Sequence, residues 1–171
     1  MTAATHLLAE AFVDEFLRNA DWQRVAADWG WVIRRPGPLT LLVALRGLEL
    51  PGVENAFTLR LECEFCPSLP PNVRFVNPDT GEYDPNVDAR HLARLIAPDC
   101  TTHKQYVFAP PYIYGPQLVC TSAGHGYYVS GHTPTEDQRW DPTRHSVGTT
   151  IQAVQRALVN PQYFQGRFGG V

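Results

Sequence analysis

The sequence predicts one α+β domain with an N-terminal helix, a four-stranded antiparallel meander sheet, an irregular active-site region and a C-terminal helix. Three observations predict this class. Apolar residues near the N-terminus recur every four positions, as on one face of a helix. Residues 57–65 alternate strictly between apolar and polar, which indicates a strand with one buried face. Residues 147–158 return to helical spacing. Strands grouped between helices favour α+β over a parallel α/β fold.

The first helix is expected from Thr5 to Asn19. Its buried face would be formed by Leu8, Phe12 and Phe16, while acidic residues take the other side. A second short helix would follow, with Trp22, Val25 and Trp29 on one face. Gly30 would end it, since glycine adopts the left-handed conformation that terminates helices.

Four strands are expected next, within residues 31–33, 39–45, 57–65 and 73–76. Proline and glycine pairs separate them and mark turns. The short turns between consecutive strands predict antiparallel neighbours in a meander.

The region after these strands has weaker signals. Residues 88–96 could form a short helix, and residues 121–144 are interpreted as a long loop because glycine, proline and polar residues dominate them. A final helix is expected from about Ser146, ending before Pro161. The domain core would span about 5–163, and a flexible tail would follow over 164–171.

Composition bounds the function. The 171 residues are 44% hydrophobic and 18% charged, which is typical of a globular domain. The formal net charge of −3 argues against a general nucleic-acid binder, because phosphate contacts need a basic surface. No run approaches the roughly 20 apolar residues needed to span a bilayer. The N-terminal segment lacks the features of a signal peptide, so a cytoplasmic location without membrane attachment is expected.

The four cysteines leave several interpretations open. In a reducing cytosol they should be thiols rather than disulfides. Cys63 and Cys66 have the Cys-x-x-Cys spacing of zinc sites, and Cys100 with His103 could complete a set of four ligands. Against a metal site, Cys63 falls on the apolar face of the 57–65 strand, where core packing explains it. A Cys/His metal-binding domain therefore remains an alternative to the function that follows.

Several motifs in order resemble those of the ubiquitin-conjugating enzymes. Residues 57–65 followed by the Pro-Pro-x-Val-x-Phe stretch at 70–75 resemble a strand, a proline-rich loop and a second strand of that family. The apolar residues 118–119 resemble the pair before its catalytic cysteine. Trp140-Asp141-Pro142 resembles its Trp-x-Pro, and the helix from Ser146 with its Leu-x-Asn-Pro ending resembles the family's next helix. The resemblance covers roughly residues 5–163 and is closest to divergent, bacterial members.

The resemblance implies a conjugating enzyme of a bacterial ubiquitin-like pathway that acts in antiviral defence. Cys120 would accept the modifier from an activating enzyme as a thioester and pass it to an amine of a protein target or another acceptor. No cofactor is implied, because the activating enzyme uses the ATP. The implied partners are the activating enzyme, the ubiquitin-like modifier and the acceptor. The small residues after Cys120 predict that its sulfur is partly exposed beside a shallow groove. A catalytically inactive variant that only binds a modifier or partner is the main alternative.

Three further residues are candidates for assisting Cys120. His125 and His132 lie in the following loop, where an imidazole could deprotonate an incoming amine. Asn86 follows Pro85 in a segment that resembles the family's His-Pro-Asn and would stabilise the oxyanion. It lies 34 residues before Cys120, farther than usual, so either an insertion separates them or residues 110–112 are the true equivalent. Each histidine could equally be a solvated loop residue, and Asn86 a turn residue.

Overall fold

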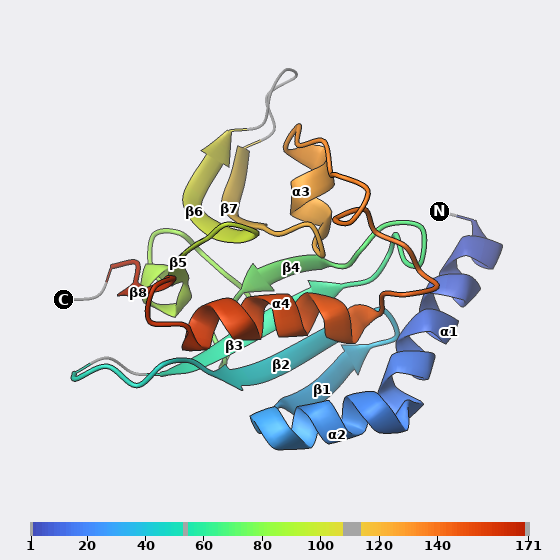
Figure 1. The fold of residues 1–171 in the computed structure, drawn as a ribbon, viewed down its shortest axis with the longest axis horizontal. Coiled ribbons are helices and arrows are strands. Elements are labelled where there is room, and N and C mark those ends of the chain that lie inside the picture. Colours follow the sequence, from blue (N-terminus) through green and yellow to red (C-terminus); the bar gives the residue numbers. More distant parts are fainter. Residues whose placement is uncertain (1, 53–54, 108–113, 170–171) are drawn as a thin grey trace.

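The structure is a computed structural model that describes residues 2–52, 55–107 and 114–169. It has an α+β architecture with four α-helices and two four-stranded antiparallel sheets in the described residues. The predicted class is confirmed, with a second sheet that the sequence did not indicate (Figure 1). Among the described residues, no helix is long and apolar enough to cross a membrane.

The N-terminal helices are α1 (Ala3–Arg18) and α2 (Ala20–Trp29). Asn19 lies between them, and its side chain caps α2 by accepting from two backbone amides of the first turn. Gly30, with φ of 67°, ends α2 as predicted. The buried face of α1 differs from the predicted one: Leu8 is 61% exposed, while Ala9, Val13 and Phe16 are buried.

The first sheet has the order β1-β2-β3-β4, the meander predicted from sequence. Its strands are β1 (Val32–Gly37), β2 (Thr40–Arg46), β3 (Ala56–Glu62) and β4 (Asn72–Phe75). The alternation in β3 buries one face as expected, but it does not continue to Phe65, which lies beyond the strand and is 51% exposed.

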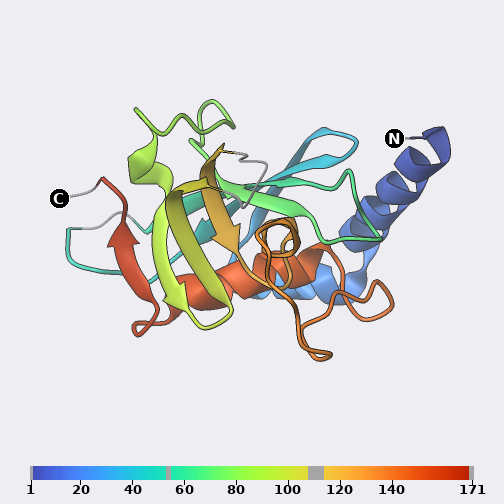
Figure 2. The same cartoon turned by 90° about the horizontal axis from the view of Figure 1, so that it is seen from above.

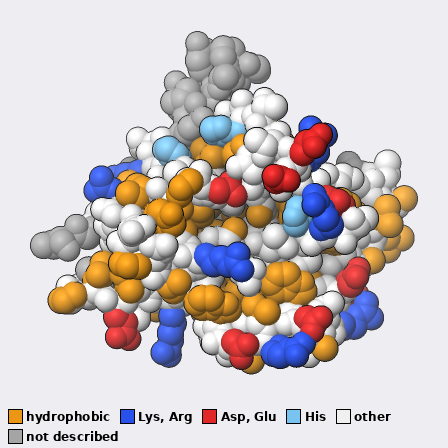
Figure 3. Space-filling model, in the orientation of Figure 1, with side chains coloured by type: hydrophobic (Ala, Val, Ile, Leu, Met, Phe, Trp, Pro, Cys, Tyr) orange, Lys and Arg blue, Asp and Glu red, His pale blue; other side chains and the backbone are white. Residues whose placement is uncertain are grey.

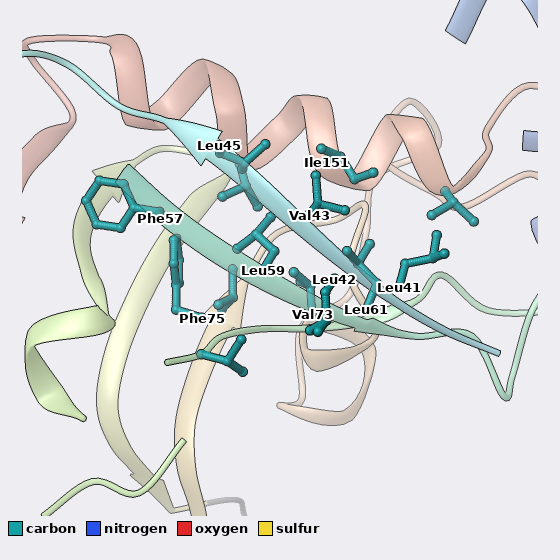
Figure 4. Close-up of a cluster of buried hydrophobic side chains, with 14 of the residues drawn as sticks. Leu41, Leu42, Val43, Leu45, Phe57, Leu59, Leu61, Val73, Phe75 and Ile151 are labelled. Atoms are coloured by element: carbon teal, nitrogen blue, oxygen red, sulfur yellow. The ribbon is translucent and has the colours of Figure 1, made fainter. Parts of the chain in front are cut away.

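Helix α4 (Val147–Val159) lies across the first sheet. Ser146 and Thr149 form a reciprocal capping box at its start, which satisfies two amides of the helix end. The predicted face is fully buried and includes Val147, Ile151, Val154 and Leu158. Figure 4 shows Ile151 beside Val43 of β2, with the aromatic and aliphatic residues of β3 and β4 continuing the core. This face, rather than helix propensity, holds α4 in place.

The second sheet has the order β7-β6-β5-β8. Its strands are β5 (Ala93–Ala97), β6 (Cys100–Val107), β7 (Tyr114–Cys120) and β8 (Phe164–Arg167). Seen from above, β6 and β7 lie over α4 (Figure 2).

Two sequence expectations are corrected in this sheet. Residues 88–96 do not form a helix, since only the 3-10 turn η1 (Ala89–His91) precedes β5. The segment expected to be a flexible tail contains β8, which pairs with β5 and buries Phe164 to 3% exposure. A large apolar side chain buried in the shared core explains why this segment is ordered as a strand.

Candidate functional site

Cys120 is the last residue of β7 and lies directly opposite Thr101 of β6. The apolar residues 118–119 precede it as predicted, but they belong to a strand that the sequence did not indicate. Its exposure is not the one predicted, because the residue is only 7% exposed. In the described part of the chain, the main hydrophobic cluster includes Val119 but not Cys120. Adjacent residues of a strand face opposite sides, so Val119 packs into the core while Cys120 faces away from it.

Polar groups surround the Cys120 sulfur. The hydroxyls of Ser130 and Thr101 are within hydrogen-bonding reach of it. Burial raises the pKa of the Cys120 thiol, the two hydroxyls oppose that rise, and the Asp99 carboxylate adds to it. Both Asp99 oxygens accept hydrogen bonds from Ser122, at 3.0 Å from its amide and 2.6 Å from its hydroxyl. The thiol is therefore neutral at rest, but donors for a thiolate are already in place.

Helix α3 (His125–Val129) packs against β7, and its Tyr127 and the following Ser130 lie near Cys120. The segment expected to be a loop over 121–144 thus contains one short helix. Gly126 lets α3 approach β7 closely, because a Cβ at this position would lie 2.6 Å from Leu118 Cδ1 and 3.1 Å from the Val119 carbonyl oxygen. Ser130, at the end of α3, reaches the sulfur as a result.

His125 is the first residue of α3 and contacts the loop after β3. Its ring stacks on Phe65 with 4.7 Å between centroids, and its amide donates to the Pro71 carbonyl at 2.9 Å. Burial lowers the pKa of His125, which favours the neutral imidazole. Its buried Nδ1 has no hydrogen-bond partner among the described residues. The imidazole thus packs α3 against the loop between β3 and β4.

His132 contacts Tyr127, a residue of α3 that lies near Cys120. Its ring stacks on Tyr127, with 4.7 Å between centroids and 17° between planes. Burial raises the pKa of Tyr127, and the charges of Asp99 and Cys120 raise it further. The Tyr127 phenol therefore lies near Asp99 and Cys120. One aromatic ring therefore separates His132 from the surroundings of Cys120. On the face drawn in Figure 3, the visible histidine side chains lie in the upper half, over the second sheet and the segment from α3 to α4.

Asn86 is a turn residue in this structure. Its backbone amide and its side-chain amide both donate to Asp84 Oδ1, at 2.8 and 3.0 Å. Such an Asx turn is an ordinary use of aspartate and asparagine. Asn86 is exposed and lies on the connection between β4 and β5. The alternative equivalent, residues 110–112, lies outside the described residues.

The structure adds three residues to the site that sequence reasoning missed: Thr101, Ser130 and Asp99. Their only sequence signal is that hydroxyl and carboxylate side chains suit a sulfur site. Which of the many such residues approach Cys120 depends on the pairing of β6 with β7.

The other cysteines are packing residues. Cys63 and Cys66 are 0% and 1% exposed, and the Cys66 thiol shares a hydrogen bond with Cys63 that raises its pKa. Within the described ranges, no group of three or more histidine, cysteine, aspartate or glutamate side chains could hold a metal ion. His103 instead pairs with Thr101, its Nε2 3.1 Å from the hydroxyl oxygen. The zinc set proposed from sequence is not assembled.

Trp140 is buried and connects the segment after α3 to two other parts of the chain. Its indole donates to the Pro67 carbonyl at 2.7 Å and meets Phe12 of α1 edge-on. The Tyr128 hydroxyl accepts from the Trp140 amide at 2.8 Å. These contacts tie the segment after α3 to the N-terminal helix and to the loop after β3.

In comparisons with known proteins, no family model, no curated protein and no solved structure matches this chain. The candidate site therefore has to be interpreted from its own geometry.

Proposed function

We propose that this chain is a conjugating enzyme of a bacterial ubiquitin-like pathway, which carries the modifier as a thioester on Cys120. The observation that supports this most is the setting of the thiol. Cys120 ends β7 on the side away from the core, with hydroxyl donors from β6 and from the end of α3. A thiolate is the nucleophile in thioester exchange, and hydrogen bonds to it favour that form.

The order of elements also supports the proposal. A helix, a four-stranded meander and a helix packed across that sheet follow the order of the motifs that resemble the conjugating enzymes. Strands β5 to β7 lie between the meander and Cys120. An insertion of these strands explains why the segment around Asn86 is far from Cys120 in sequence.

The reaction would have two steps. The Cys120 thiolate attacks the thioester carbonyl that joins the modifier's C-terminal glycine to the activating enzyme, and the activating enzyme's sulfur leaves as a thiolate. An amine then attacks the new thioester, loses a proton and displaces Cys120. Because Cys120 is 7% exposed, α3 has to move for either partner to reach the sulfur.

The burial of Cys120 favours a second candidate, a variant that binds a modifier or partner without carrying it. In that case the raised pKa of the Cys120 thiol reflects a packed residue, and the protein works through its surface alone. The two candidates differ in whether Cys120 is needed.

The test is a charging reaction with the activating enzyme, the modifier and ATP. The protein should gain one modifier through a bond that reducing agent cleaves. Cys120→Ser should form a thiol-resistant ester instead, and Cys120→Ala should gain nothing. Cys100→Ala and Cys66→Ala are matched controls, since these buried thiols should be dispensable for charging. Charging of Cys120→Ala at the unmodified rate would remove the carrier proposal and leave the binding candidate.

A further inference from the structure

A chain of side chains leads from Cys120 to an exposed imidazole. Thr101 and Cys120 are paired residues on neighbouring antiparallel strands, so their side chains share one face of the second sheet. The Thr101 hydroxyl reaches the sulfur, and its oxygen lies 3.1 Å from His103 Nε2. His103 shares that face because it is two residues along β6. The connected groups are thus thiol, hydroxyl and imidazole.

We infer that His103 accepts the Cys120 proton through the Thr101 hydroxyl. In the reaction of Cys120, Thr101 relays the proton and His103 is the base that takes it up. The thiol gives its proton to Thr101 Oγ1, and Thr101 gives its own proton to His103 Nε2. The products are a Cys120 thiolate and a His103 imidazolium. When the thiolate displaces the sulfur of an incoming thioester, the departing thiolate takes up a proton from the imidazolium or from water, so protons balance.

The other groups near the sulfur do not offer this route. The Ser130 hydroxyl is also 3.1 Å from the Tyr127 carbonyl oxygen, which is not a base at neutral pH. Both oxygens of Asp99 accept from Ser122. Among the described residues, Cys100 of β6 and Tyr127 of α3 also interact with Cys120, and burial raises the pKa of each. A neutral imidazole nitrogen can take up a proton as a general base, which a backbone carbonyl or a hydroxyl does not do.

The role of His103 in charging rests on the proposed function, but the proton route can be tested without an activating enzyme. The full-length protein is treated with iodoacetamide between about pH 5.5 and 9, and alkylation of Cys120 is followed by mass spectrometry. His103→Gln should lower the Cys120 rate near pH 7 by about 100-fold, the lower end of general-base assistance. The loss should shrink toward pH 9, where hydroxide removes the proton.

Matched variants separate proton transfer from structure. Thr101→Val should show the same altered pH profile as His103→Gln. Thr101→Ser keeps a hydroxyl and should have the pH profile of the unmodified protein. The double variant His103→Gln with Thr101→Val should be no slower than either single variant, because the two substitutions block the same proton route. His6→Gln, on α1, is the control for loss of an imidazole.

Two results would overturn the inference. One is a His103→Gln profile that superimposes on that of the unmodified protein. The other is a Thr101→Ser profile as altered as that of His103→Gln. A proton route demonstrated in a protein that never gains a modifier would refute the proposed function alone. A protein that charges on Cys120 with an unmoved profile would refute the His103 route alone.

Discussion

The side-chain amide of Gln117 bonds to both backbone polar groups of Phe75. Its Oε1 accepts from the Phe75 amide at 2.9 Å, and its Nε2 donates to the Phe75 carbonyl at 2.7 Å. Gln117 belongs to β7 and Phe75 to β4, the edge strand of the first sheet. A single side chain therefore occupies the place of a neighbouring strand and joins the two sheets. It also fixes β7, and hence Cys120, relative to the core.

The first prediction is that Gln117→Ala destabilises the protein by about 2–4 kcal/mol. The substitution leaves two buried backbone groups without a partner, each costing about 1–3 kcal/mol. Urea unfolding at neutral pH measures the free energy. Gln162→Ala is the control, because this residue is exposed beyond the end of α4. Equal stability of the two variants would show that the sheets are held together without this amide.

The second prediction concerns pH. Burial lowers the pKa of His125 in the folded protein, so between about pH 6.5, its ordinary pKa, and that lower value the unfolded chain binds more protons. Stability then rises with pH across this window and is lost as pH falls through it. His145 adds to the same slope, because burial lowers its pKa as well.

His125→Phe tests this assignment, since a phenyl ring keeps the stacking on Phe65 and removes the titrating group. The variant should lose less free energy of unfolding than the unmodified protein between about pH 7.5 and 5.5. Urea unfolding at several pH values within this range measures the difference, with His6→Gln as the control. An unchanged slope in His125→Phe would mean that His125 is not held neutral by burial.

The third prediction is that the purified protein binds no stoichiometric zinc through Cys63 and Cys66. Both thiols are buried against each other, and the described residues supply no third ligand beside them. Elemental analysis should find well below one zinc per chain, and a chelator should leave the thermal midpoint unchanged. One zinc per chain that is lost in Cys66→Ala would restore the metal-binding interpretation.

The sequence predicted an element well where its apolar residues recur at regular spacing along the whole element. The helix α4 and the strand β3 each bury a regular series of aliphatic residues, and both were predicted with nearly correct bounds. Sequence reasoning failed in β5 to β7 because buried polar residues interrupt the pattern there. Thr102 is buried with its hydroxyl bonded to the Ala93 carbonyl at 2.6 Å, and Gln117 is 5% exposed. A polar residue on the core side of a strand hides the alternation, although tertiary hydrogen bonds satisfy it.

The site shows the same limit. That Cys120 follows apolar residues and precedes small ones can be read from residues 118–123, but the strand β7 that holds it was not predicted. Its partner Thr101 comes from a different strand, and Ser130 from the end of a five-residue helix. The burial of the sulfur depends on how closely α3 packs on β7, which the bare backbone of Gly126 decides. Small residues beside a cysteine therefore indicate close packing as readily as exposure.

The last prediction is that Gly126→Ala opens the cover of Cys120. An added Cβ would meet Leu118 at 2.6 Å and the Val119 carbonyl oxygen at 3.1 Å, so α3 must move away from β7. Overpacking of this kind costs about 1–3 kcal/mol, and a local loss of that size should speed Cys120 alkylation at least about fivefold. Gly37→Ala is the matched control, because its Cβ would meet only Thr40, at ordinary contact distances of 3.8 Å or more. Cys100 reports global unfolding, since it is 3% exposed on the opposite face of the second sheet. Equal acceleration at Cys100 and Cys120 would show that the whole domain opens, and would contradict α3 as the local cover that has to move before Cys120 can react.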